Sequence, residues 1–493
     1  MGRLFVSFEG TASGYGGVGA VNRVAARVLR ESFPTVADPA EADLQVLLFG
    51  GSLPAGPRRL FLDHGSFADA GFWAYVAPAL RTTDAILVSC RACIEVAERM
   101  LASPRPELRL VPLFADTGTF RPAEDRGALR RELVPRLAVP ADASWLLAVS
   151  SFDRRKNLHL AVELLRALVD RLPDVHLLVV GSAEGDERGA YARSIDERAA
   201  ELGIQDRVHR LGSLRHAALR DLMAASDLLV HLTTCRLENF GLVVAEALAS
   251  GLPVVAADWG GLRDLVRGGE TGVLAPTHLS RRGPRVDWRA AVEPAAELLA
   301  DRARWSAVSA WASGFAAEAL SVPSYTGRLR DAVSALLGER PVEDRPVTLS
   351  EHGQDVAFET YALYRRQPEI RSTGAEYRAL LARRGGELCR ILSGPAARSE
   401  RPPAWTARTR LYPAVRYDVV GDRIDASSDP AWPFALDGAP LEAALARAVL
   451  DAPGGLTVEE AARARQQDEP TDVLVAAASG LVDEGLLCPL AAG

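Results

Sequence analysis

The sequence predicts an α/β protein with two doubly wound parallel sheets that face a cleft, followed by a mainly helical extension. Three observations predict it. Short apolar runs alternate with helical patterns over residues 1–140, and the alternation restarts over residues 141–322 after a proline-rich and charge-rich stretch. Beyond residue 341 no strand-rich pattern is evident. Runs that are apolar on both faces and separated by helices are typical of parallel strands covered by helices.

Size and composition exclude several classes of protein. At about 150 residues per domain, 493 residues correspond to roughly three domains. A hydrophobic fraction of 48% with 25% charged residues excludes wholesale disorder. The 57 basic against 64 acidic residues give a net charge of -7, which argues against a dedicated nucleic-acid or anionic-membrane binder. We expect a cytoplasmic protein, because the chain shows no secretory signal, no transmembrane segment and only five scattered cysteines.

The strands of the two units can be placed in order. The first unit should contain strands at Leu4–Phe8, Leu44–Phe49, Leu60–Asp63, Ala85–Ser89 and Leu108–Pro112. The second should contain strands at Trp145–Val149, Val175–Val180, Val208–Leu211, Leu228–Leu232 and Val254–Ala257, with helices that include Leu158–Arg171 and Ala217–Ala225. Residues 287–337 read as helical and residues 338–346 as a linker. Ligands of open α/β sheets bind outside the carboxyl ends of the strands, so the loops there are the candidate sites.

Two glutamates follow the strand Leu228–Leu232. Glu238 stands at its carboxyl end, and Glu246 lies about two turns inside the next helix, which we expect to begin with Asn239 as N-cap and to end before Gly251. The backbone N–H groups of Phe240, Gly241 and Leu242 should point outward and form a phosphate site. Carboxylates on either side of a phosphate suit a ligand with hydroxyls at both ends, as in a nucleotide sugar.

A second candidate site follows the strand Trp145–Val149. Arg154, Arg155 and Lys156 are adjacent cations in a strand-to-helix loop, where their mutual repulsion favours a bound anion. Lys156 is the only lysine among the 57 basic residues of the chain. A mobile lysine ammonium group beside planar arginine guanidinium groups favours a pyrophosphate ligand.

Weaker signals lie in the first unit. A glycine-rich loop with Gly16 and Gly17 precedes a helix and would let a backbone approach an anionic ligand. His64 directly follows the third strand. The single pair Cys90 and Cys93 is a poor zinc site, and we expect two ordinary semi-buried cysteines, with redox chemistry as the alternative.

These motifs together resemble the retaining GT-B glycosyltransferases of family 4, the group 1 class, over about residues 1–337. The matching segments are Glu238 to Glu246 as Glu-x7-Glu, Ala247 to Val254, Gly260 to Asp264, Glu270 to Pro276, and Val111 to Pro122. The resemblance implies a GT-B fold with an acceptor lobe at 1–140, a nucleotide-sugar donor lobe at 141–322, a helix returning to the first lobe and a linker at 323–340, and an extension at 341–493.

The resemblance also implies roles for the candidate residues. Glu246 would hold the donor ribose, Glu238 would face the donor sugar and Lys156 would neutralise the diphosphate. His64 would line the sugar site, and Gly16 with Gly17 would lie under donor phosphate or acceptor. The family usually has an arginine where this chain has Ser151, so Arg154 or Arg155 is expected to replace it. Asp264 stands where the family commonly has glutamate.

Charge defines the expected reaction. Breaking an anomeric bond to a nucleoside diphosphate develops negative charge on the leaving phosphate, which cations and helix-start amides stabilise. No Asp-x-Asp triplet is evident that would hold Mg²⁺ or Mn²⁺, so we expect no metal and no cofactor beyond the donor substrate, with a UDP-sugar as the expected donor. The alternatives are a GT-B phosphorylase or epimerase, and a non-catalytic regulator that binds a nucleotide sugar.

The end of the extension reads as three short helices and a closing strand, similar to a small winged-helix module. From Leu441 to Gly493 it carries three arginines against nine acidic residues, which argues against a nucleic-acid partner. A peptide or protein acceptor docking on this extension is one prediction, because similar modules bind leader peptides of modified natural products. Plain structural packing is the other.

Overall fold

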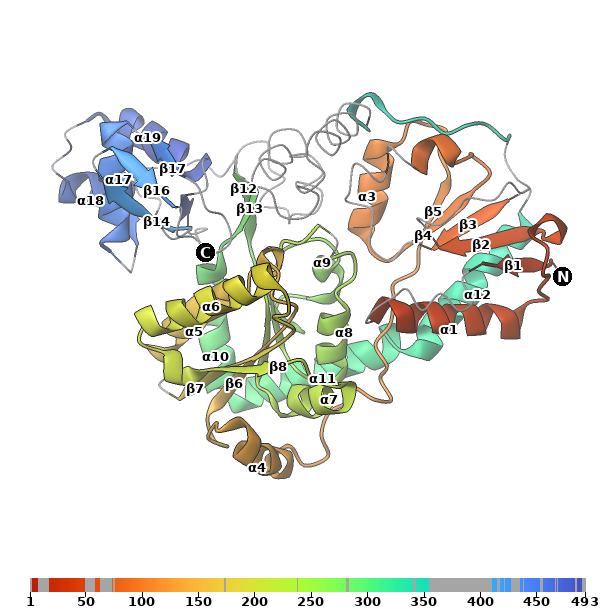
Figure 1. Ribbon diagram of the computed structural model, residues 1–493, viewed down its shortest axis with the longest axis horizontal. Helices are drawn as coiled ribbons and strands as arrows, with labels where there is room; N and C mark the ends of the chain where they lie inside the picture. The colour runs from red at the N-terminus through yellow and green to blue at the C-terminus, as the bar shows by residue number, and fades with distance from the viewer. Residues whose placement is uncertain are drawn as a thin grey trace.

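The computed structural model describes most of the two α/β units and parts of the extension. The described residues are 2–7, 17–48, 58–62, 73, 76–172, 174–236, 238–280, 283–339, 343–353, 410–414, 417–420, 422–426, 435–437, 439–452, 455–465, 467, 469–483 and 486–489. They form two lobes and a smaller C-terminal module (Figure 1).

The N-terminal lobe contains a five-stranded parallel sheet in the order β1-β2-β3-β4-β5. Its strands are β1 (Leu4–Val6), β2 (Leu44–Leu48), β3 (Arg59–Leu62), β4 (Ala85–Val88) and β5 (Glu107–Leu110). All five predicted strands are present, and β1, β4 and β5 end before their predicted last residues. The described strands follow one another in chain order, so the reversal of a doubly wound sheet is found only in the second lobe.

The described helices of the N-terminal lobe include two amphipathic ones. They are α1 (Gly17–Ser32) and α3 (Arg91–Met100), with short 3-10 turns at η1 (Pro39–Glu41) and η2 (Ala77–Ala79). Cys90 is the N-cap residue of α3. Its Sγ lies 3.3 Å from that of Cys93, and both cysteines are fully buried rather than semi-buried, because they pack against the strand that precedes the helix.

The second lobe contains a six-stranded parallel sheet in the order β11-β10-β9-β6-β7-β8. Its strands are β6 (Ser144–Val149), β7 (Val175–Val180), β8 (Val208–Gly212), β9 (Leu228–His231), β10 (Val254–Ala257) and β11 (Gly272–Ala275). The strand order reverses between β6 and β9, as in a doubly wound sheet, and this is where a ligand site is expected. The sequence did not predict β11 or the hairpin β12 (Thr277–Ser280) and β13 (Gly283–Val286).

Helices cover this second sheet on its two faces. They are α4 (Arg126–Leu137), α5 (Leu158–Val169), α6 (Asp186–Glu201), α7 (His216–Ala225), α8 (Leu242–Ala249), α9 (Leu262–Leu265), α10 (Val292–Ala300) and α11 (Arg302–Ala319), with 3-10 turns η3 (Arg154–Lys156), η4 (Gln205–Arg207) and η5 (Trp288–Ala291). Arg126 and Arg130 of α4 both bind Asp227 of this lobe. The boundary predicted at residue 140 therefore falls after a helix that packs on the second lobe.

The chain then returns to the N-terminal lobe through α12 (Val322–Gly338), as predicted for residues 323–340. Arg109 of β5 donates a hydrogen bond to the carbonyl of Ala332 at 3.3 Å, and Glu339 accepts from Arg109 at 2.6 Å. Residues 343–350 continue along the same lobe, where Asp344 pairs with Arg81 at 2.6 Å. The first stretch of the predicted extension is thus part of the N-terminal lobe.

The C-terminal module has its own core. Its three predicted helices are α17 (Pro440–Leu450), α18 (Val458–Ala464) and α19 (Thr471–Asp483). Two small antiparallel sheets accompany them, in the orders β18-β14-β19 and β15-β16-β17, of which only the closing strand was predicted. Their strands are β14 (Arg410–Pro413), β15 (Asp418–Val420), β16 (Arg423–Asp425), β17 (Ala435–Asp437), β18 (Leu456–Thr457) and β19 (Leu487–Pro489). The buried side chains between residues 411 and 487 form a cluster separate from those of the two lobes.

Candidate active site

The loop after β6 positions Lys156. Asp153 caps η3 by accepting a hydrogen bond from the backbone N–H of Arg155 at 2.9 Å. Asn157 then takes a left-handed conformation, with φ of 54°, and its Nδ2 donates to the carbonyl of Leu232 at 2.9 Å and to Oγ1 of Thr234 at 3.0 Å. Because these bonds tie the loop after β6 to the loop after β9, Lys156 is held beside the second candidate segment.

Lys156 and Glu238 form an ion pair in which the Lys156 ammonium bonds Oε2 of Glu238. Burial opposes ionisation of both groups. The pKa of Lys156 is nevertheless raised by the Glu238 carboxylate, and the pKa of Glu238 is held well below its usual range by Lys156 and then by His231. Two residues predicted from separate motifs therefore meet at the carboxyl edge of one sheet.

The other two cations of the predicted cluster have protein partners. The guanidinium of Arg155 forms a paired contact with the Asp153 carboxylate, with nitrogen-to-oxygen distances of 2.9 and 2.5 Å. The guanidinium of Arg154 lies 5.6 Å from the ring centroid of Tyr191. Whether either one replaces the arginine expected at Ser151 stays a prediction.

The start of α8 differs from the prediction. The helix begins at Leu242 with Gly241 as N-cap, at φ of 88°, and Asn239 is not the cap residue. A positive φ is strained for residues with a side chain, so glycine suits this position. Among the described residues, the backbone N–H groups of Phe240, Gly241 and Leu242 have no protein acceptor, which leaves them available to a ligand.

Gly261 supports this helix start by a close backbone approach. A Cβ at position 261 would lie 1.9 Å from the carbonyl oxygen of Asn239. We expect Gly261→Ala to lower the free energy of unfolding by about 2 to 3 kcal/mol, because backbone must move on one side of the contact. Denaturant unfolding measures this. Gly314→Ala, in an open part of α11, should instead be neutral or stabilising by up to about 1 kcal/mol, and equal losses in both variants would contradict the steric explanation.

Glu246 lies in α8 with its carboxylate largely buried. No hydrogen bond or ion pair to that carboxylate is present among the described residues, and burial raises its pKa to about 7. A largely buried carboxylate with no partner in the described part of the chain, next to helix-start amides that lack a protein acceptor, is a candidate for binding ligand hydroxyls. This environment agrees with the ribose-binding role that the resemblance implies, which stays a prediction.

The raised pKa of Glu246 gives a pH-dependent stability. Its carboxyl has an ordinary pKa of 4.5 and a folded value of about 7, so between these values the folded state binds more protons than the unfolded chain. Stability contributed by this group is therefore full below about pH 4.5 and lost as pH rises through 7. We expect Glu246→Gln to be more stable than the unsubstituted protein at pH 8, by about 3 kcal/mol at most, with little difference at pH 4.5.

Urea unfolding at pH 4.5, 6 and 8 tests this difference, with Glu318→Gln on the exposed face of α11 as the control for removing a carboxylate. The control should keep the pH profile of the unsubstituted protein. A Glu246→Gln protein with that same profile would show that the Glu246 carboxyl is not desolvated.

The two lobes meet at their carboxyl edges through Asp264. Its Oδ2 accepts a hydrogen bond from the backbone N–H of Arg91 at 2.8 Å, and its Oδ1 lies 3.2 Å from the Arg91 guanidinium. Arg91 follows β4 of the N-terminal lobe and Asp264 follows β10 of the second lobe. The contact therefore brings the carboxyl edges of the two sheets to face each other.

Part of the predicted site falls outside the described residues. His64 and Gly16 are not among them, and Gly17 is described only as the first residue of α1. His231, which the sequence interpretation did not select, lies 3.6 Å from Glu238. The sequence feature that could have identified His231 is its place at the end of an otherwise apolar strand, seven residues before the first glutamate of the Glu-x7-Glu segment.

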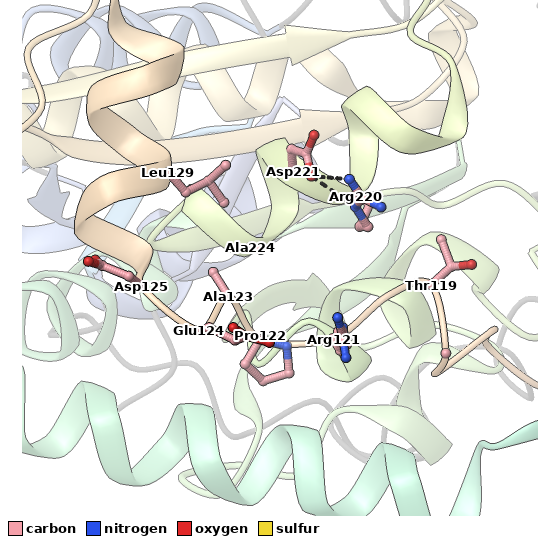
Figure 2. Close-up of a pocket in the computed structure, with 11 residues that line it drawn as sticks. Thr119, Arg121, Pro122, Ala123, Glu124, Asp125, Leu129, Arg220, Asp221 and Ala224 are labelled. Atoms are coloured by element: carbon pink, nitrogen blue, oxygen red, sulfur yellow. Dashed lines mark hydrogen bonds and ion pairs between the residues drawn. The ribbon is translucent and has the colours of Figure 1, made fainter.

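A cavity of about 350 Å³ lies elsewhere, between the connection of the two lobes, the start of α4 and α7 (Figure 2). It is lined by Gly118, Thr119, Arg121, Pro122, Ala123, Glu124, Asp125, Leu129, Arg220, Asp221 and Ala224. Ala224 comes just before β9, and Pro122 lies near Gly251 just before β10. The cavity is thus at the amino edge of the sheet, opposite the edge that carries Lys156 and Glu238.

Comparison with known proteins identifies the central part of the chain. A family model described as glycosyl transferases group 1 matches residues 130–283. Residues 130–283 form a group 1 glycosyltransferase domain. This glycosyltransferase domain contains Lys156, Glu238 and Glu246, and the resemblance predicted from their motifs is confirmed.

Curated glycosyltransferases are similar to part of the chain. The chain is 34% identical over 241 residues to a D-inositol 3-phosphate glycosyltransferase of Thermobispora bispora, covering 45% of this chain and 53% of that protein. It is 32% identical over 197 residues to the lipopolysaccharide core biosynthesis mannosyltransferase LpsB of Rhizobium meliloti, covering 40% and 51%. The matched part spans about half the length of these relatives.

Solved structures share the two-lobed fold. Anabaena Alr3699/HepE, solved in complex with UDP and glucose, aligns with a TM-score of 0.52 at 18% identity, over 68% of this chain and all of that one. A glycosyltransferase of Rickettsia africae aligns with a TM-score of 0.50 at 14% identity, over 68% and 90%. The fold is GT-B, as predicted. No helix among the described residues is long and apolar enough to span a membrane.

Proposed function

We propose that the chain transfers a sugar from a nucleoside diphosphate sugar to an acceptor nucleophile, with retention of anomeric configuration. The observation that carries this proposal is the grouping, at one edge of the glycosyltransferase domain, of Lys156, Glu238 and Glu246 around unpaired amides at the start of α8. A cation and amide dipoles suit a diphosphate, and buried carboxylates suit the hydroxyls on its two sides.

The proposed chemistry follows from these positions. As the anomeric bond breaks, negative charge grows on the leaving diphosphate, where Lys156 and the amides of Phe240, Gly241 and Leu242 stabilise it without reorganising. Glu246 accepts hydrogen bonds from the ribose, and Glu238 faces the donor sugar. In this proposal these groups supply the positive charge at the phosphates and no metal ion is needed. His64, Gly16 and Gly17 stay predicted contributors from the N-terminal lobe.

We propose a UDP-sugar as the donor, which the complex of HepE with UDP and glucose supports by analogy of fold. Thermal unfolding of the full chain with UDP, GDP, ADP or TDP should show the largest rise with UDP, because ligand binding stabilises the folded state. Release of UDP from UDP-sugars in the presence of acceptors then tests transfer. Proton NMR of the product reports its anomeric configuration. Binding of UDP without turnover on any acceptor would contradict transfer and favour a nucleotide-sugar-binding regulator.

We propose that the acceptor is a peptide presented by the C-terminal module. The module is docked on the second lobe: Arg289 of η5 donates to the carbonyl of Pro413 at 2.8 Å and lies 5.0 Å from the ring centroid of Tyr412, and α19 packs near β12. A fixed module can hold an acceptor at a set distance from the donor.

Arg289→Ala tests this acceptor proposal by loosening the module. Transfer to peptide acceptors should fall, while hydrolysis of the donor stays at the level of the unsubstituted protein. A parallel loss of both would contradict a presenting role. Arg304→Ala, which breaks an exposed ion pair of the same lobe, controls for the loss of an arginine.

A further inference from the structure

His231 ends β9 directly beneath the candidate site. Its imidazole is buried, with 6% exposure, and its Nε2 lies 3.6 Å from Oε2 of Glu238. Within the described part of the chain this nitrogen has no hydrogen-bond partner. A buried ring nitrogen usually has a partner, so an Nε2 left just beyond bonding distance of a carboxylate indicates a contact that forms in another state of the site.

The same oxygen of Glu238 has a second neighbour, which is a cation. Lys156 bonds the same Oε2, and the charged or titratable groups near Lys156 are Asp153 of the preceding loop and Cys235 of the loop after β9. Burial opposes the Glu238 carboxylate, but Lys156 and then His231 outweigh it and hold the pKa of Glu238 well below its usual range. Lys156 and His231 thus approach the same oxygen atom of Glu238.

A diphosphate would compete with Glu238 for Lys156. The ammonium can satisfy both only in part, because a diphosphate carries more negative charge than one carboxylate. As Lys156 turns to the phosphates, Glu238 becomes a buried carboxylate with a weakened partner, which is strongly unfavourable. His231 is the group already in place to replace that partner.

We propose, on the basis of the proposed donor site, that His231 is a positioning residue for Glu238. When Lys156 engages the donor diphosphate, the imidazole takes up a proton from solvent and donates Nε2–H to the Glu238 carboxylate. Glu238 then stays ionised and oriented toward the donor sugar. Donor binding is thereby coupled to proton uptake by a side chain that does not touch the donor.

Calorimetric titration of the full chain with UDP tests the coupling. At pH 7.5, in buffers of different ionisation enthalpy, the unsubstituted protein should take up more protons per UDP bound than His231→Gln. The comparison isolates His231, because Glu246, whose pKa is about 7, is present in both proteins. Equal proton uptake in the two proteins would overturn the proposal. Thermal unfolding of His231→Gln and of His231→Asn measures whether each variant folds. The titration is carried out on a variant that shows a cooperative unfolding transition.

A second measurement does not depend on nucleotide. The NMR signal of His231 Cε1–H, assigned by its loss in His231→Gln, should titrate at lower pH in Glu238→Gln than in the unsubstituted protein, because the carboxylate charge is gone. It should titrate at higher pH in Lys156→Met, where Glu238 lacks its other cation. An unchanged titration in both variants would overturn the pairing. Absence of UDP binding would refute the proposed donor and the coupling, but this titration would still decide the pairing.

The pH profile of turnover separates positioning from structural support. His231→Gln retains an amide donor but cannot carry charge, so kcat should fall, by the same factor at every donor concentration, with little change in KM. A loss confined to stability, with kcat and its pH profile unchanged, would overturn the positioning role.

Discussion

Lys156→Met is expected to lower the rate of sugar transfer by about 100- to 1,000-fold, the loss typical of removing one group that stabilises transition-state charge. The ammonium is held beside Glu238 at the carboxyl edge of the sheet, where phosphate oxygens are expected. UDP affinity should fall as well. Steady-state kinetics with a UDP-sugar and isothermal titration with UDP measure the two effects.

The controls for this variant separate charge, fold and chemistry. Arg166→Met removes a cation from the exposed face of α5 and should leave turnover within about 2-fold. Lys156→Met also leaves Glu238 without its closest partner, so its folded state should be destabilised. The double variant Lys156→Met with Glu238→Gln should recover stability but not activity. Near-normal turnover in Lys156→Met would remove the basis of the proposed mechanism.

Asp227→Ala is expected to lower the free energy of unfolding by about 3 to 5 kcal/mol, because it removes the buried carboxylate that two largely buried arginines and a third, more exposed arginine share. Asp227 is 3% exposed, and its carboxylate accepts hydrogen bonds from Arg126 at 2.6 Å, Arg130 at 3.0 Å and Arg302 at 3.0 Å. Burial already lowers the pKa of Arg130 to about 10 against the attraction of Asp227. Without the carboxylate the guanidinium groups repel each other.

Denaturant unfolding measures the loss, and a matched control is available nearby. Asp221 pairs with Arg220 at 2.7 Å, but both side chains are more than a third exposed to solvent. Asp221→Ala should therefore cost less than about 1 kcal/mol. If the free energy of unfolding of Asp227→Ala lies within 1 kcal/mol of that of the unsubstituted protein, the stability of the arginine cluster does not depend on this carboxylate.

The candidate site was predictable where local pattern defines it. A strand followed by a cationic loop, and another followed by Glu238 and a helix, determine which residues reach the carboxyl edge of a sheet. That Lys156 and Glu238 bind each other was not predictable, because it depends on β6 and β9 being neighbours. The folding back of Arg155 onto Asp153, and the choice of Gly241 over Asn239 as helix cap, also depend on three-dimensional contacts.

The order of hydrophobic runs by itself determined two parallel-sheet lobes, because apolar strands alternating with helices can bury both faces only in that arrangement. It also determined the motifs that place the glycosyltransferase domain. Only the tertiary structure decided that α4 belongs to the second lobe, that residues 343–350 pack against the N-terminal lobe, and that His231 lies close to Glu238. These are contacts between segments far apart in the chain, and no local pattern encodes a distance between them.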